Sequence, residues 1–295
     1  MGGYRLSSPG ATLAVMEKYN LTARKRYGQN FLIDANILRK IAEGSGAGKE
    51  DTILEIGPGI GTLTQVLAET AGSVVAVEID RDLIPVLEDT LSDHPNVTVI
   101  NEDILKADLS ELSVRYAGGR PFRVVANLPY YITTPIIMEL LRKEAPVSSI
   151  TVMIQKEVAE RMQAQPGTKD YGALSLAVQY YSEARILTEV SKECFLPRPK
   201  VDSSVIRLDR YGALRREDFS LTEDTENLMF GLIRAAFNQR RKTLANAVSN
   251  DASLPFSREE TGEALTGMGL SEMIRGEKLS LAEFAALAIV LSKKR

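Results

Sequence analysis

Short apolar runs alternate with stretches of helical period over the first two thirds of the chain. The runs predict strands at 52–56, 74–79, 97–101, 122–127 and 150–154. Apolar residues at helical spacing predict helices between them, as over 63–69 and 82–91. Because strands that alternate with helices form parallel sheets covered on both faces, we expect an α/β domain of that kind.

The pattern changes after a late strand predicted at 203–208. Residues 209–224 are polar and without period, which predicts a linker. Beyond them only helices are expected, at 227–237, 240–248, 258–266 and 281–291. The sequence therefore predicts two domains, an α/β domain over 1–211 and a small all-helical domain over 212–295.

The composition narrows the class of protein. Of 295 residues, 44% are apolar and 25% charged, which is ordinary for a globular protein. No run approaches the ~20 apolar residues of a membrane helix, and the first 20 residues lack the apolar core of a signal peptide. With one cysteine, Cys194, and one histidine, His94, the sequence argues against a disulfide, a His-based triad and a Cys/His zinc site. We expect a cytoplasmic protein with no metal and no membrane contact.

Charge is unevenly distributed although the net charge is only −3. Residues 1–40 carry seven basic and two acidic side chains, and 231–249 carry four basic side chains and no acid. An acidic protein with such confined basic patches can bind a polyanion through them. The alternative is that these side chains only form solvated helix faces.

A glycine-rich loop, GPGIG at 57–61, follows the first predicted strand. Glycine lets the backbone approach a ligand closely at the carboxyl edge of an α/β sheet. Glu78 ends the second strand, 21 positions after Gly57, where a carboxylate can accept from both hydroxyls of a ribose. Asp103 follows the third strand and can accept from an adenine amine or cap a turn. These features leave both NAD and S-adenosylmethionine open as the cofactor.

The end of the fourth strand carries Asn127-Leu128-Pro129-Tyr130. This tetrapeptide resembles the Asn/Asp-X-Pro-aromatic motif of methyltransferases that act on exocyclic amines. The Asn127 side-chain oxygen and the Leu128 carbonyl can hold the two N–H groups of such an amine and direct its lone pair toward a methyl donor. Pro129 fixes the turn, and Tyr130 offers a face for base stacking, worth ~1–3 kcal/mol. The alternative is a proline turn with an aromatic plug.

Seven motifs together resemble the KsgA/RsmA family, the small-subunit ribosomal RNA adenine dimethyltransferases. In chain order they are QNFL (29–32), EIGPGIGTLT, VEID, NEDIL, NLPYYITTP, FLPRPKVDSSV and FNQRRKTLANAV. They cover residues 24 to about 248 and narrow the choice of cofactor. The resemblance implies a Rossmann-like class I S-adenosylmethionine-dependent methyltransferase fold. Residues 1–20 lie outside the motifs and receive no role.

The same resemblance implies roles for individual residues. Asn30, Leu32 and Gly57 would contact the methionine part of S-adenosylmethionine. Asn127 would bridge the methyl group and the target amine, and Phe195 would stack on the target base opposite Tyr130, although Phe195 could instead be a loop anchor. The implied cofactor contacts are Asn30, Leu32, Gly57, Gly59, Glu78, Asp103, Ile104 and Asn127. The implied catalytic set is Asn127, Leu128, Pro129, Tyr130 and Phe195. The implied RNA contacts are Arg24, Lys25, Arg26, Arg198, Lys200, Arg240, Arg241 and Lys242.

The implied reaction places two methyl groups on N6 of each of two adjacent adenines. The substrate would be a hairpin loop near the 3′ end of 16S rRNA in the immature 30S subunit, with a role in small-subunit biogenesis. Nothing in the sequence indicates an obligate dimer, so we expect a monomer.

Four alternatives remain open at this stage. An Erm-type enzyme would dimethylate 23S rRNA, but the motif wording and the long helical domain disfavour it. A DNA adenine methyltransferase would need a target-recognition insert that the sequence lacks. A ribosome-assembly checkpoint factor would act mainly by binding, and this is compatible with catalysis. A nicotinamide-dependent dehydrogenase would need a suitably placed acid/base histidine.

Overall fold

The computed structural model describes residues 6, 8–21, 30–141, 145–211 and 215–294. Contacts divide the chain into two compact units, Met1–Ala159 with Ala184–Arg210, and Glu160–Glu183 with Tyr211–Arg295. The end of the first unit at Arg210 lies next to the predicted boundary at 211/212. Residues 160–183, which the sequence pattern placed in the first domain, pack instead with the helical unit.

The first unit contains a seven-stranded sheet in the order β4-β3-β2-β5-β6-β9-β7. Its strands are β2 (Thr52–Ile56), β3 (Ser73–Glu78), β4 (Val97–Asn101), β5 (Phe122–Asn127), β6 (Val147–Gln155), β7 (Ser182–Val190) and β9 (Ser203–Arg210). The first five of the order are parallel neighbours, while β9 runs antiparallel to β6. The sheet is thus mixed rather than wholly parallel as the alternating pattern predicted.

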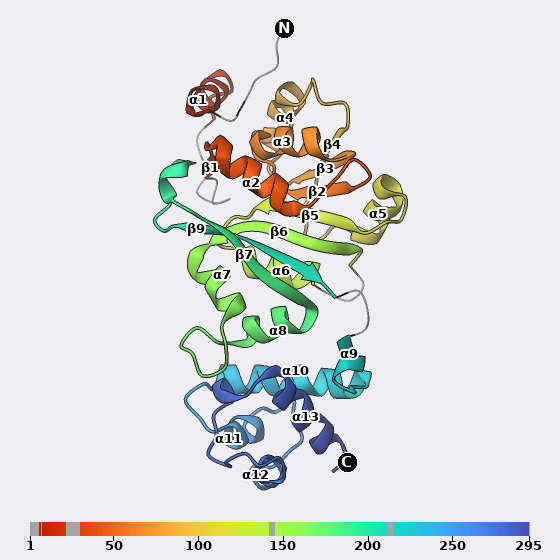
Figure 1. Cartoon of the computed structure of the whole chain (residues 1–295), viewed down its shortest axis with the longest axis vertical. Helices are drawn as coiled ribbons and strands as arrows, with labels where there is room; N and C mark the ends of the chain where they lie inside the picture. The colour runs from red at the N-terminus through yellow and green to blue at the C-terminus, as the bar shows by residue number, and fades with distance from the viewer. Residues whose placement is uncertain (1–5, 7, 22–29, 142–144, 212–214, 295) are drawn as a thin grey trace. The chain divides into compact units, whose positions relative to one another are not determined.

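Helices lie on both faces of this sheet (Figure 1), as in the predicted Rossmann-like fold. The helices of the first part of the chain are α1 (Pro9–Lys18), α2 (Ala35–Ser45), α3 (Thr62–Thr70), α4 (Ile84–Thr90), α5 (Leu109–Ala117), α6 (Thr133–Leu140) and α7 (Lys156–Gln163), the last of which continues into the second unit. Local chemistry explains where several begin. The Asp34 carboxylate accepts from the first-turn amides of α2, and Asp108 does the same for α5.

A second, two-stranded sheet pairs β1 (Phe31–Leu32) with β8 (Phe195–Leu196) in antiparallel fashion. Phe31 lies opposite Leu196, and Leu32 lies opposite Phe195. The Ile33 N–H extends the pairing by donating to the Cys194 carbonyl over 2.9 Å. Two motifs more than 160 positions apart, QNFL and FLPRPK, are therefore adjacent in space.

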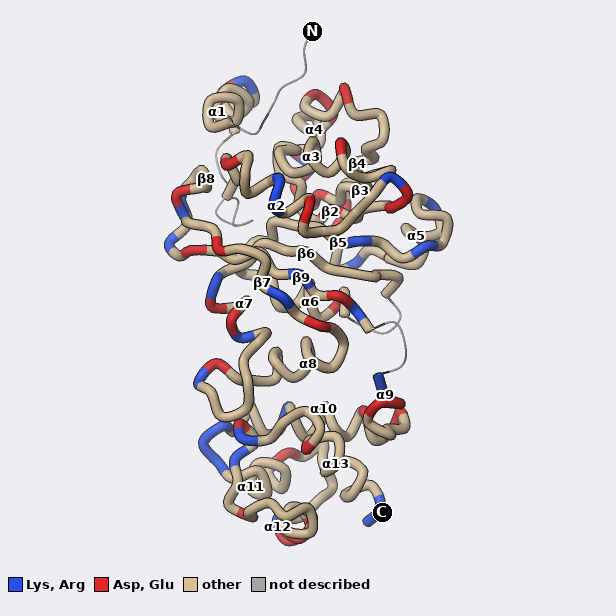
Figure 2. The backbone as a smooth tube through the Cα atoms, in the orientation of Figure 1, with Lys and Arg blue, Asp and Glu red and all other residues tan. Residues whose placement is uncertain are grey.

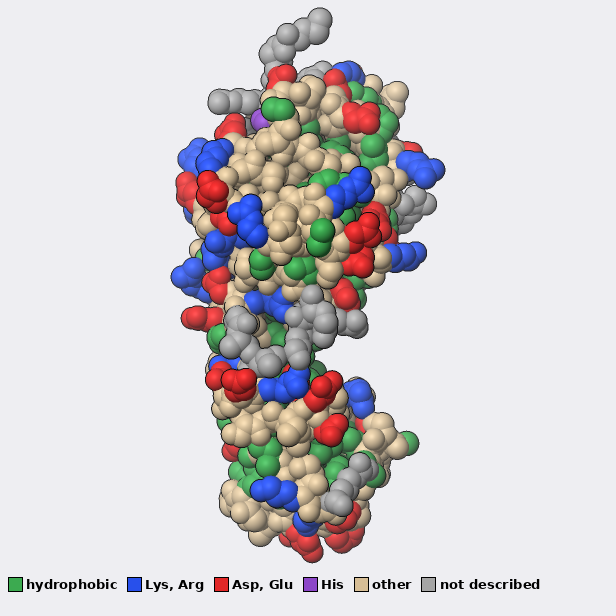
Figure 3. Space-filling model, turned by 90° about the vertical axis from the view of Figure 1, so that its right-hand side faces the viewer, with side chains coloured by type: hydrophobic (Ala, Val, Ile, Leu, Met, Phe, Trp, Pro, Cys, Tyr) green, Lys and Arg blue, Asp and Glu red, His purple; other side chains and the backbone are tan. Residues whose placement is uncertain are grey.

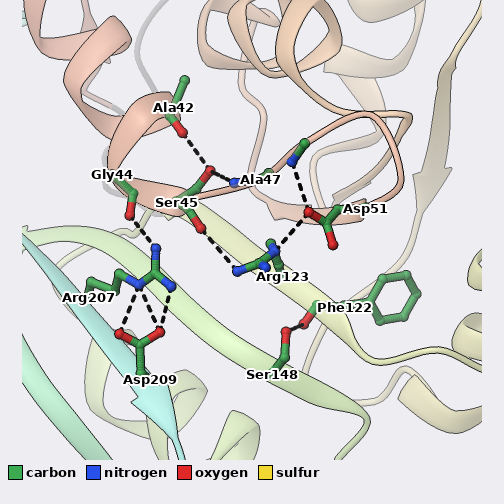
Figure 4. A network of polar contacts seen from close by, with 11 residues as sticks. Ala42, Gly44, Ser45, Ala47, Asp51, Phe122, Arg123, Ser148, Arg207 and Asp209 are labelled. Atoms are coloured by element: carbon green, nitrogen blue, oxygen red, sulfur yellow. Dashed lines mark hydrogen bonds and ion pairs between the residues drawn. The ribbon is translucent and has the colours of Figure 1, made fainter.

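A polar network lies at the amino-terminal edge of the parallel strands of the large sheet (Figure 4). Arg207 on β9 donates to the Gly44 carbonyl at 2.8 Å and forms a bidentate pair with Asp209. Arg123 on β5 contacts Asp51 at 3.1 Å. The two guanidinium groups place positive charge at the carboxyl end of α2, where the helix dipole favours it. We assign this network a structural role, because ligands bind α/β sheets at the opposite edge.

The second unit is built around α8 (Ala173–Tyr181), α10 (Glu223–Asn238), α11 (Leu244–Ser249), α12 (Arg258–Gly267) and α13 (Leu281–Ser292), with the short α9 (Arg215–Asp218). Its buried core takes Tyr171, Leu176 and Tyr180 from the 160–183 segment. The Tyr171 hydroxyl donates to the Leu279 carbonyl at 2.8 Å. Aromatic burial and this buried hydrogen bond explain why the segment joins the helical unit. In the described part of the chain, no helix is long and apolar enough to cross a membrane.

Candidate active site

A cavity opens at the carboxyl ends of β2, β3, β4 and β5, the edge where α/β sheets bind ligands. Its empty volume is about 1110 Å³, with the open solvent at its mouth included. The cavity brings together every predicted cofactor-binding and catalytic residue: Asn30, Leu32, Gly57, Gly59, Glu78, Asp103, Ile104, Asn127, Leu128, Pro129, Tyr130 and Phe195.

The glycine loop forms one wall of the cavity. Gly57 and Gly59 have φ values of 67° and 63°, in the left-handed region that favours glycine. A Cβ built on Gly57 would meet no heavy atom within 4 Å. The loop therefore leaves a cradle at Gly57 in which a ligand can contact the backbone.

Glu78 is almost fully buried at the end of β3. One carboxylate oxygen accepts from the Gly59 N–H at 3.2 Å, and the other accepts from the Asp80 N–H at 2.8 Å. Burial raises the pKa of Glu78, and these backbone donors oppose the rise. Each oxygen keeps lone-pair capacity for a further donor, so the carboxylate can accept from the hydroxyls of a ribose.

Asp103 lies in the cavity wall just beyond β4. Its Oδ1 accepts from the Leu105 N–H at 3.1 Å, so the turn-capping role weighed from the sequence is present. Its Oδ2 lies 3.9 Å from the Nζ of Lys106, which is loose for an ion pair. The two roles are compatible, because the cap uses one oxygen of the carboxylate.

The Asn127 side chain has a defined orientation. Its Nδ2 donates to the Asn30 carbonyl at 3.0 Å. Because a carbonyl can only accept, the amide nitrogen must face Asn30, and Oδ1 remains available as an acceptor. This hydrogen bond also joins the QNFL segment to the NLPY motif across 97 positions of sequence.

Hydrogen bonds also hold the rest of the NLPY motif. The Leu128 N–H donates to the Met153 carbonyl at 3.1 Å, and the Thr133 hydroxyl donates to the Pro129 carbonyl at 3.1 Å. The Tyr130 hydroxyl lies 2.8 Å from the Oγ of the buried Ser203, and burial raises the pKa of this tyrosine. These contacts set the turn that follows β5 and the position of the Tyr130 ring in the cavity wall.

Phe195 lines the same cavity and is only 4% exposed. It belongs to a core cluster that includes Leu32 and Leu38, so the anchoring role weighed from the sequence is also present. Through the β1–β8 pairing, Phe195 is tied directly to the backbone of the QNFL segment.

Glu55 is a cavity residue to which the sequence analysis gave no role. Glu55 is the second-last residue of β2, its side chain lines the cavity, and it is 1% exposed. Among the described residues, its Oε2 has no hydrogen-bond partner. Burial raises its pKa to about 8, which the neighbouring Thr64 side chain opposes and the Glu78 charge reinforces. An acidic residue two positions before Gly57, inside an otherwise apolar strand, was the available signal in the sequence.

The predicted RNA contacts that the structure describes do not line this cavity. Arg24, Lys25 and Arg26 fall outside the described residues. Arg198 pairs with Glu193, and Lys200 is exposed. The basic run 240–242 occupies the connection between α10 and α11 (Figure 2).

Within that run the three side chains differ. Arg240 is held within the second unit by Glu277 and the Lys169 carbonyl, each at 2.7 Å. Arg241 and Lys242 are exposed. Basic and acidic side chains are interspersed over the face in Figure 3, so local clusters rather than a uniform field would contact a polyanion.

Comparison with known proteins distinguishes between the enzyme classes that have a cavity of this kind. The sequence profile of the family described as "Ribosomal RNA adenine dimethylase" matches residues 20–291. The chain belongs to this family. The Lachnoclostridium phytofermentans protein "Ribosomal RNA small subunit methyltransferase A" is 53% identical over 290 residues, which cover 98% of both chains. The protein of the same name from Clostridioides difficile is 49% identical over 290 residues, again 98% of both chains.

Two solved structures share the fold. A dimethyladenosine transferase from Plasmodium falciparum has a TM-score of 0.73 at 26% identity and covers 90% of this chain and 98% of its own. The 23S rRNA methyltransferase ErmE has a TM-score of 0.67 at 27% identity, with coverage of 89% and 99%. As an rRNA adenine dimethylase, the chain is a methyltransferase that uses S-adenosylmethionine.

The cavity fits that cofactor. The open space at Gly57 admits a ligand against the backbone, and the buried Glu55 carboxyl has a polar oxygen without a partner among the described residues. In the described ranges, no three His, Cys, Asp or Glu side chains gather as metal ligands.

Proposed function

We propose that this protein transfers methyl groups from S-adenosylmethionine to N6 of two adjacent adenines in a 3′-terminal hairpin loop of 16S rRNA. The orientation of the Asn127 amide carries the proposal, because it leaves an acceptor in a cavity that also contains Glu78. The two relatives named for the small ribosomal subunit are 49% and 53% identical to this chain. ErmE, which is named for 23S rRNA, is 27% identical. These identities favour the small-subunit substrate over an Erm-type substrate.

Different residues of the cavity would contact different parts of the cofactor. S-adenosylmethionine supplies a methyl group on a sulfonium centre. Glu78 would accept from the ribose hydroxyls, Asp103 and Ile104 would contact the adenine, and Gly57 and Asn30 would hold the methionine part. All of these residues line one continuous cavity. Leu32 and Gly59 would close its walls.

The acceptor amine would be held by the NLPY motif. The Asn127 Oδ1 and the Leu128 carbonyl would accept its two N–H groups, which directs the lone pair toward the methyl donor. Positive charge develops on the nitrogen during transfer, and the two oxygen dipoles would stabilise it. The Asn30 carbonyl would preserve this arrangement by keeping the amide nitrogen of Asn127 turned away.

The target base would stack on the Tyr130 ring, with Phe195 on the opposite side. A loop adenine can be splayed out at small cost because it is not held in a duplex. Arg241 and Lys242 of the helical unit would bind RNA phosphates, together with Lys200, the last residue of the FLPRPK run. Arg24, Lys25, Arg26 and Arg198 remain in the proposed RNA-binding set. For Arg240, its contacts with Glu277 and Lys169 favour a structural role.

We further propose that the substrate is the immature 30S particle and that the protein acts in the cytoplasm as a monomer. The test offers methyl-labelled S-adenosylmethionine with small subunits that lack the modification, and with unmodified large-subunit RNA in parallel. We expect dimethyladenosine only in small-subunit RNA after digestion. Label in the large-subunit RNA would move the protein to the Erm type, and no label in either would overturn the proposed substrate.

A further inference from the structure

Helix α1 lies outside the part of the chain that the family profile matches, which begins at residue 20. The helix is short, but its N-terminus is capped. Pro9 occupies its first turn, and the Ser8 hydroxyl accepts from the Ala11 N–H at 3.3 Å. Ten residues of helix are marginal in isolation, so its stability must come from the surface on which it packs.

That surface is the outer side of the cavity wall. Leu6 and Val15 are fully buried and form one apolar cluster with Phe31, Ile60, Leu83 and Val86. Figure 1 shows α1 beside β1, and the shared cluster brings α1 to Val86 of α4. The helix is therefore part of the packed first unit.

Three partners of α1 in this cluster line the cavity or directly adjoin a residue that does. Phe31 and Leu83 line the cavity, and Ile60 is part of the glycine loop. The Phe31 ring lies 3.2 Å from where a Cβ of Gly59 would stand, so it packs directly on that loop. Phe31 thus lines the cavity and contacts the glycine loop, and it also packs in the same apolar cluster as Val15 of α1.

A chain of hydrogen bonds links the same elements. The Leu6 N–H donates to the Gln65 Oε1 at 3.2 Å, and the Gln65 Nε2 donates to the Thr90 carbonyl at 2.9 Å. The Thr90 hydroxyl in turn donates to the Ile60 carbonyl at 2.9 Å. The Thr12 hydroxyl of α1 donates to the Leu6 carbonyl at 3.3 Å. The backbone at Leu6 is therefore coupled to the backbone of the glycine loop.

We propose that Leu6 and α1 are positioning elements for the cofactor: they hold Phe31 and the glycine loop in the geometry that binds S-adenosylmethionine. The inference rests on the cavity being the cofactor site. Because α1 supports the cofactor wall and lines no part of the cavity, its loss should weaken cofactor binding and leave the rate at saturating cofactor unchanged. By linkage, bound cofactor should in turn protect α1.

The test compares Val15→Ala with Leu13→Ala. Both substitutions shorten an aliphatic side chain on α1, but Val15 is buried against the cluster whereas Leu13 is 52% exposed. We expect Val15→Ala to raise the Kd for S-adenosylmethionine by about fivefold or more, with kcat unchanged, and Leu13→Ala to leave both unchanged. Calorimetry gives the Kd, and a methyl-transfer assay at saturating cofactor gives kcat.

A second variant, Thr12→Val, keeps the side-chain shape and removes only the hydrogen bond to Leu6. Thr12→Val should raise the Kd for S-adenosylmethionine by a smaller factor than Val15→Ala. It tests the same inference if Val15→Ala does not fold. Hydrogen exchange of the α1 amides should slow when the cofactor binds the unaltered protein. Equal Kd values for both buried variants and Leu13→Ala would overturn the inference. Failure of the unaltered protein to bind the cofactor would overturn the proposed function instead.

Discussion

Replacing Glu55 by glutamine should make the protein relatively more stable as the pH rises. Glu55 is fully buried in the cavity floor, and burial raises the pKa of its carboxyl from 4.5 to about 8. Glutamine keeps nearly the same volume and cannot ionise. The comparison therefore isolates the free energy of ionising one buried carboxyl.

The sign follows from proton counting. Between pH 4.5 and about 8 the folded protein keeps the Glu55 proton, while the unfolded chain releases it. The unfolded state then binds fewer protons, so the free energy of unfolding falls as the pH rises. One proton corresponds to about 1.4 kcal/mol for each pH unit. Over the full interval the loss is on the order of 5 kcal/mol, and it is complete above the folded pKa.

Urea unfolding of both proteins across this interval measures the effect. The stability of Glu55→Gln relative to the unaltered protein should increase by about 1.4 kcal/mol per pH unit from about pH 5 to about pH 8. The variant Glu102→Gln, which removes a carboxylate from the wall of the same cavity, controls for the loss of one charge. A stability difference that is the same at every pH would refute the argument that burial keeps Glu55 protonated.

Three further predictions concern the site and its RNA contacts. Asn127→Ala should lower kcat by about 10²–10³-fold in single-turnover assays while binding to small subunits survives; a near-normal rate would contradict the assigned acceptor. Tyr130→Phe should keep the stacking face and the rate, but leave the buried Ser203 hydroxyl unpaired and cost about 1 kcal/mol of stability in urea unfolding; an unchanged stability would contradict this. The double change Arg241→Ala with Lys242→Ala should weaken RNA binding and reduce the salt dependence of log K by roughly 1–2; an unchanged slope would remove both from the phosphate contacts.

The sequence by itself determined the framework of the site. Strands β2, β4 and β5 lie at the residues that the apolar runs predict, and Glu78 and Asn127 end their strands as expected. In a parallel sheet the carboxyl ends of neighbouring strands meet at one edge. The chemistry that follows each strand in sequence therefore converges in space. Local pattern predicted that Gly57, Glu78, Asp103 and Asn127 share one edge, whereas the family resemblance alone added Asn30, Leu32 and Phe195, and Glu55 received no role.

Contacts between distant segments decided the rest. Strand β7 was not predicted, because its edge position leaves most of its residues partly exposed and its apolar pattern weak. The predicted helix at 240–248 begins only at Leu244, since the 239–242 stretch forms a turn in which Arg240 reaches Glu277 and Lys169. The 160–183 segment joined the helical unit through the burial of Tyr171 and its hydrogen bond to Leu279.

The same distinction applies within the cavity. The β1–β8 pairing, the Asn127–Asn30 hydrogen bond and the packing of α1 on Phe31 each join segments far apart in the chain. The raised pKa of Glu55 depends on complete burial, which many segments produce together. Periodicity and motif spacing report only what neighbours along the chain impose, whereas desolvation and the choice of hydrogen-bond partner depend on the whole folded unit. The sequence thus determined which groups follow each strand and meet at the sheet edge, and the tertiary structure decided which distant segments join them and how each group is held.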